Sequence, residues 1–152
     1  RGIRNNQRAT AETIENNVRK LIIDEHPINP KYYDDMSDLL QALIEQRRQE
    51  AISYQEYLNR IVALARKVKE PWRGSYPPPI STKALQALYD NLGKDEVLAV
   101  AVDTAVKENM QDGWLNNGIK VKKVKNAIKS TLNDDTLTDN ILELVKHQHE
   151  YQ

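Results

Sequence analysis

The fold is decided by stretches such as residues 53–68, SYQEYLNRIVALARKV, in which apolar side chains recur every three or four positions. That spacing places them on one face of an α-helix. Ser53 and Glu56 have the spacing of a capping box, in which each side chain accepts a hydrogen bond from the backbone at the helix start. The stretch therefore predicts an amphipathic helix that begins after Ser53 and ends at Glu70-Pro71.

The same periodicity continues along the chain, and no stretch alternates with the period of two that is typical of strands. We expect an all-α fold, a single domain of about seven helices around one Leu/Ile/Val core. Residues 1–9 are polar and should form a flexible lead-in, with Thr10 as the first helix cap and the domain spanning residues 10–152. A proline-rich loop near residues 71–80 contains three consecutive prolines, which favour a stiff extended spacer. That loop could separate two sub-lobes, residues 10–70 and 81–150, or pack across one core.

Composition excludes several classes of protein. The chain has 152 residues, 22 basic and 22 acidic side chains and no cysteine. Disulfide scaffolds, thiol nucleophiles and cysteine-ligated metals are therefore ruled out. No apolar run approaches the roughly 18 residues of a membrane span, so we expect a cytoplasmic protein without membrane contact. Because the chain begins at Arg1 and not at Met, we also expect it to be part of a longer protein.

Motifs for catalysis or cofactor binding are not found. Gly93-Lys94 lacks the upstream glycine and the following Ser or Thr of a phosphate-binding loop. His147 and His149 are two positions apart, so on a helix they do not face one another as zinc ligands would. We therefore predict no catalytic residue, no metal ligand and no cofactor in this chain.

Charge is distributed unevenly despite the zero net charge. All nine arginines lie at or before Arg73, and five of the nine lysines after residue 76 lie between Lys120 and Lys129. If Val124 and Ile128 are buried, these lysines spread over the exposed side of a helix, where like charges repel one another. A polyanion would relieve that repulsion, although a charged run can equally be an ordinary solvated surface. The predicted DNA contacts are Lys120, Lys122, Lys123, Lys125 and Lys129.

A second basic set is found before the proline-rich loop. We add Arg66, Lys67 and Arg73 to the candidate DNA contacts. Here intrahelical ion pairs, such as Arg60 with Glu56, are a stronger alternative explanation for the charges.

Two tryptophans flank turns rich in arginine or asparagine. Trp72 and Trp114 could each anchor a partner or pin their own loop to the core. The predicted partner interface comprises Trp72, Tyr76, Trp114 and Asn117. A nucleotide site using Trp72, Arg73 and Tyr76 remains an alternative.

Several sequence motifs, taken in their order along the chain, resemble the C-terminal region of the motor (R) subunits of type I restriction enzymes. The resemblance covers roughly residues 10–132 and leaves residues 133–152 unmatched. It is carried by AETIENNVRK at residues 11–20, Asn29-Pro30, YQEYL at residues 54–58, ALYDNL at residues 87–92, QDGW at residues 111–114 and the basic segment 120–128.

The resemblance implies a non-catalytic helical domain of an ATP-dependent deoxyribonuclease and DNA translocase, a parent enzyme that uses ATP and Mg. The implied partners are the rest of the motor subunit, double-stranded DNA and a methyltransferase core of modification and specificity subunits. It also implies that this domain docks the motor onto that core and contacts duplex DNA through the segment around Lys120. A protein-interaction module without DNA contact remains the alternative.

Overall fold

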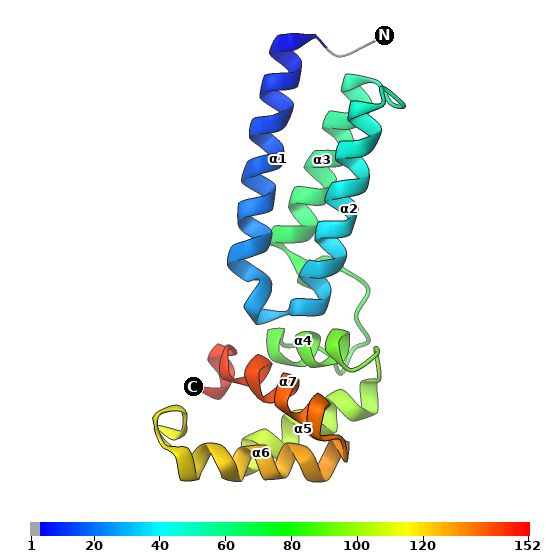
Figure 1. The fold of residues 1–152 in the computed structure, drawn as a ribbon. Coiled ribbons are helices and arrows are strands. Elements are labelled where there is room, and N and C mark those ends of the chain that lie inside the picture. The colour runs from blue at the N-terminus through cyan, green and yellow to red at the C-terminus, as the bar shows by residue number, and fades with distance from the viewer. Residues whose placement is uncertain (1–3) are drawn as a thin grey trace. The chain divides into compact units, whose positions relative to one another are not determined.

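A computed structural model describes residues 4–152, and this part of the chain contains no strand. Figure 1 shows the helices in chain order. Seven α-helices are present in the described part: α1 (Asn5–Glu25), α2 (Pro30–Arg48), α3 (Tyr54–Lys69), α4 (Lys83–Asn91), α5 (Glu96–Asn109), α6 (Gly118–Leu132) and α7 (Asp135–Lys146). The predicted all-α fold is confirmed. Within residues 4–152, no helix has both the length and the apolar character that a membrane crossing requires.

The chain divides into two compact units. Unit 1 comprises the chain up to His26 together with Tyr32–Gly74, and unit 2 comprises Pro27–Lys31 and Ser75–Gln152. Each unit has its own cluster of buried apolar side chains, whereas we expected one core. The apolar stripes of three long helices bury one another in unit 1, and those of four shorter helices do so in unit 2. Two separate cores therefore form.

The first helix begins earlier than the sequence predicted. α1 starts at Asn5, whereas Thr10 was the expected cap and residues 1–9 the expected flexible lead-in. The Arg4 backbone N–H donates to Gln7 Oε1 at 3.1 Å, and the Thr10 hydroxyl bonds the Asn6 carbonyl inside the helix. These local bonds extend the helix through a polar segment. Residues 1–3 of the predicted lead-in lie outside the described residues.

Unit 1 contains α1, α2 and α3, which run alongside one another (Figure 1). The Ser53 half of the capping box predicted at α3 is confirmed, since Ser53 Oγ accepts a hydrogen bond from the Glu56 backbone at 3.1 Å, while the Glu56 carboxylate pairs with Arg60. Its core holds Tyr33, Leu40 and Ile44 of α2 against Tyr57 and Ile61 of α3, all at most 4% exposed. The apolar spacing seen in the sequence is therefore the packing face of the bundle.

Unit 2 contains α4 to α7, in which α5 packs on α6 and α6 packs on α7. The proline segment enters this unit through a turn, because the Ile80 backbone N–H donates to the Pro77 carbonyl at 2.9 Å. It is thus a loop, as predicted, but its three prolines do not form an extended spacer. Ile80 is 1% exposed, and its burial draws the chain back into the core.

The unmatched tail, residues 133–152, forms the last side of unit 2. Asp134 caps α7 by accepting from the Leu137 backbone, and Ile141, Leu144 and Val145 enter the core. A short 3-10 helix, His149–Tyr151, follows and buries Tyr151 completely. The tail is therefore part of the fold and not an appendage to it.

Candidate nucleic-acid interface

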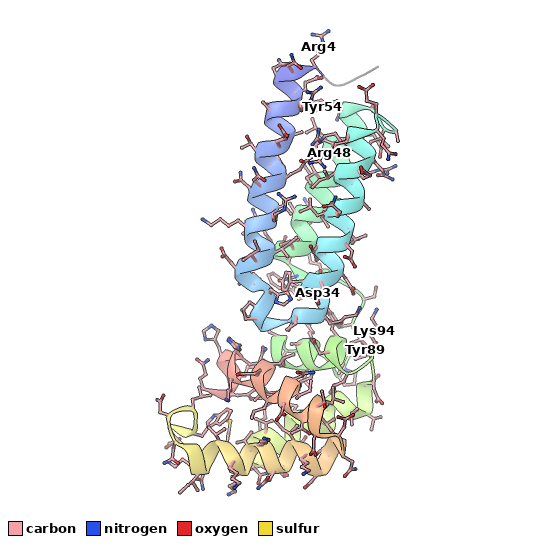
Figure 2. All side chains as sticks on the ribbon, in the orientation of Figure 1. Arg4, Asp34, Arg48, Tyr54, Tyr89 and Lys94 are labelled. Carbon is pink, nitrogen blue, oxygen red and sulfur yellow. The ribbon has the colours of Figure 1, made fainter. Side chains whose placement is uncertain are left out.

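The lysine-rich segment is held on α6 by local and core interactions. Asn117 Oδ1 accepts from the backbone N–H groups of Ile119 at 3.0 Å and Lys120 at 3.2 Å, which caps the helix start. Val124 and Ile128 are both 0% exposed and turn one face of the helix into the core of unit 2. The lysines on the other faces of α6 are consequently directed outward. Figure 2 shows side chains standing out from α6 along its length.

The five predicted lysines do not form a single ridge. At about 100° per residue, Lys122, Lys125 and Lys129 fall within an arc of about 60° on one side of α6. Lys123 lies about 100° away from Lys122 on the same scale. The Lys120 ammonium donates to the Asp112 carbonyl at 2.7 Å. We call Lys122, Lys125 and Lys129 the lysine row.

The lysine row lines a groove of about 650 Å³ between α6 and α7. Lys125 Nζ lies 3.1 Å from Asp139 Oδ1, and Lys129 Nζ lies 3.0 Å from Asp135 Oδ1. The lysine side chains remain 45% and 56% exposed in these pairs. Lys122 is exposed and has no ion pair within the described part of the chain. The groove thus presents three ammonium groups, two of them next to carboxylates.

Asp135 and Asp139 were not predicted as part of this site. A signal was present in their spacing, because Asp135 and Asp139 are four residues apart on α7, as Lys125 and Lys129 are on α6. To pair these aspartates with these lysines, one must also know the register of α6 against α7, and a local sequence pattern does not contain that register.

The second basic set lies in unit 1. Arg66 and Lys67 are exposed on α3 and point about 100° apart. Arg73 Nε binds Glu70 Oε1 at 2.7 Å, and Arg60 binds Glu56 at 2.9 Å, which is the expected intrahelical pair. The structure therefore divides the predicted DNA contacts between two units, with the five lysines in unit 2 and these residues in unit 1.

The four residues of the predicted partner interface differ in their exposure. Trp72 is 47% exposed, so its ring can meet a partner. Tyr76 is half-buried, and its hydroxyl donates to Asp90 at 2.6 Å. The exposed Asn117 uses its side-chain oxygen to cap α6.

Trp114 was wrongly assigned to the partner interface. The side chain is 2% exposed, and its indole N–H donates to the Tyr151 carbonyl at 2.6 Å. The acceptor lies 37 residues further along the sequence, and Tyr151 belongs to the same buried cluster as Trp114. Trp114 therefore holds its turn against the core of unit 2.

The alternative nucleotide site loses two of its groups to internal contacts. Arg73 is engaged with Glu70, and the Tyr76 hydroxyl is engaged with Asp90. Each group is thus committed within its own unit, while Trp72 keeps a half-exposed ring.

No family model matches the chain, and no curated protein or solved structure was found to be similar to it.

Proposed function

We propose that this chain is a non-catalytic domain of a type I restriction motor subunit that contacts duplex DNA and docks the motor onto its methyltransferase. The observation that carries the proposal is the lysine row on the exposed side of α6. The order of motifs that resembles the R subunits supports the choice of parent enzyme. ATP, Mg and the nuclease chemistry would belong to other parts of that subunit.

The lysine row suits the backbone of a duplex better than its bases. Ammonium groups act as point charges toward phosphate oxygens and need little shape complementarity. The residues that line the groove include no arginine, which reads guanine with paired hydrogen bonds, and Asn126 is the one amide among them. We therefore propose contact that is independent of DNA sequence, as a translocating motor requires.

The DNA contact predicts a change in salt dependence. Replacing Lys122, Lys125 and Lys129 with glutamine should weaken duplex binding, because each phosphate that the chain no longer neutralises keeps its condensed counterion. The logarithmic slope of affinity against salt should become shallower by about 0.9 for each such phosphate. Fluorescence anisotropy with a labelled duplex at several salt concentrations would measure both effects.

A matched control separates local contact from net charge. Lys20, Lys69 and Lys94 are exposed and outside the lysine row, so their replacement with glutamine removes the same total charge. Equal slopes for the two triple variants would contradict the assignment of the row. Failure of the unsubstituted chain to bind a duplex would contradict the DNA contact and favour the protein-interaction alternative.

The docking role predicts a hot spot at Trp72. Large aromatic rings that become fully covered at an interface often contribute about 2 kcal/mol or more, which is about thirtyfold in affinity. Trp72→Ala should therefore reduce binding of the chain to the modification and specificity subunits of its own restriction system by about that factor. Isothermal titration calorimetry would test this, with Val97→Ala, at 80% exposure, as the control. Absence of any association by the unsubstituted chain would refute the docking role.

A further inference from the structure

The carboxylates opposite the lysine row form a regular two-step ladder. Lys125 pairs with Asp139 and Lys129 with Asp135, and both helices place the two partners four residues apart. Four residues advance about 6 Å along a helix, so the two pairs lie about one turn apart. Because α6 and α7 run in opposite directions, the order of the pairs matches the antiparallel register. The ladder is thus produced by helix packing and not by one isolated contact.

Both carboxylates accept hydrogen bonds as phosphate oxygens would. An ammonium group binds a carboxylate or a phosphate through the same kind of charge-assisted hydrogen bond. Asp135 and Asp139 therefore occupy, toward Lys129 and Lys125, the place that two backbone phosphates would take. The two kinds of anion cannot both hold a lysine at full strength.

The pairs are weak enough to exchange. The carboxylate side chains are 79% exposed at Asp135 and 63% exposed at Asp139, and water and salt screen such pairs strongly. Lys122 lies on the same side of α6 without an ion pair in the described part of the chain. An approaching polyanion can therefore meet Lys122 first and displace the carboxylates afterwards.

We propose that Asp135 and Asp139 are an internal competitor that occupies two lysines of the row and limits their binding to duplex DNA. This inference rests on the proposed DNA contact and adds its regulation. The competitor keeps the contact between the lysine row and DNA weak and exchangeable. A domain that slides along a duplex needs such a contact. It also lowers the repulsion among the lysines when DNA is absent.

The test is to neutralise the competitor without removing a lysine. The variant Asp135→Asn/Asp139→Asn should bind a labelled duplex about fivefold or more tightly at low salt, as expected for the release of two exposed ion pairs. Its salt slope should be steeper than that of the unsubstituted chain, because more counterions are then released on binding. Glu108→Gln/Glu143→Gln is the control, since it removes the same charge at exposed positions outside the groove.

The outcomes separate the inference from the proposed function. Binding by Asp135→Asn/Asp139→Asn equal to that of the control would overturn the competitor, while a weakened Lys122, Lys125 and Lys129 variant would still uphold DNA contact. Absence of duplex binding in all variants would overturn both. Circular dichroism checks that α7 remains folded, which we expect because its cap, Asp134, is retained. Should the double variant unfold, Asp139→Asn alone should still bind more tightly than Glu143→Gln, and equal binding would reject the competitor.

Discussion

Replacement of Glu15 with alanine should lower the free energy of unfolding of unit 1 by about 3–5 kcal/mol, the usual cost of breaking a buried ion pair by removing one partner. Glu15 of α1 accepts two hydrogen bonds from Arg47 of α2, at 2.6 and 3.0 Å. The side chains are 4% and 3% exposed. The variant leaves the buried Arg47 guanidinium without the carboxylate that accepts its two hydrogen bonds.

Tyr57 of α3 completes the same network. Its hydroxyl donates to Glu15 Oε2 at 2.9 Å, so one carboxylate links all three helices of unit 1. Burial raises the pKa of the Tyr57 hydroxyl, with the Glu15 carboxylate adding to the effect, so the phenol stays protonated and remains a donor. Hydrogen bonding to Glu15 raises the pKa of Arg47 and keeps its charge in place. Loss of Glu15 therefore removes hydrogen-bond partners from two helices at once.

Urea unfolding followed through the NMR signals of α1, α2 and α3 would measure this loss. Glu56→Ala is the matched control, since it breaks an ion pair with Arg60 whose side chains are 47% and 46% exposed. That control should cost no more than about 0.5 kcal/mol. Replacing Glu15 and Arg47 together with leucine and methionine should recover much of the loss, because no buried charge then remains. An equal cost for Glu15→Ala and Glu56→Ala would refute the network.

Helices were predictable because their signals are local. The Ser53 cap and the apolar stripe of α3 need only neighbouring residues, and both are confirmed. Division into two cores depends on which stripes meet, and the three-to-four spacing is the same in every helix. Leu39 illustrates the limit, since it lies in the apolar pattern of α2 but is 46% exposed at the flank of the bundle.

The parts of the candidate site that depend on local sequence were also predictable, and the parts that depend on distant residues were not. Burial of Val124 and Ile128 placed the lysine row on the surface, and both were predictable from spacing. The carboxylate partners depend on the register of α7 against α6, and the burial of Trp114 depends on a chain end 37 residues away. The sequence pattern therefore located the lysine-rich surface, but it did not predict the carboxylates that pair with the lysines or the burial of Trp114.

Tyr151→Ala should destabilise unit 2 by about 3–5 kcal/mol, the range for truncating a fully buried aromatic side chain. The Tyr151 ring is 0% exposed, its hydroxyl donates to the buried carboxylate of Asp103, and burial raises its pKa so that it remains protonated. Asp103 would keep the ion pair with Lys107, in which Nζ and Oδ2 are 3.3 Å apart. The Trp114 indole donates to the Tyr151 carbonyl, and the variant would remove the aromatic ring of that same residue.

Trp114 itself reports the unfolding of this unit. In a Trp72→Phe background, its fluorescence during urea denaturation should show a lower midpoint for Tyr151→Ala. Tyr151→Phe keeps the ring and removes the hydroxyl, so it should cost about 1–3 kcal/mol for the underbonded carboxylate. His149→Ala, at an exposed position in the same short helix, should change the midpoint little. The ring and the hydroxyl of Tyr151 act on different neighbours. If Tyr151 holds the core of unit 2 together, the urea midpoint should therefore be lowest for Tyr151→Ala, higher for Tyr151→Phe and highest for His149→Ala. A Tyr151→Ala midpoint equal to that of His149→Ala would show that α5 and Trp114 are held without it.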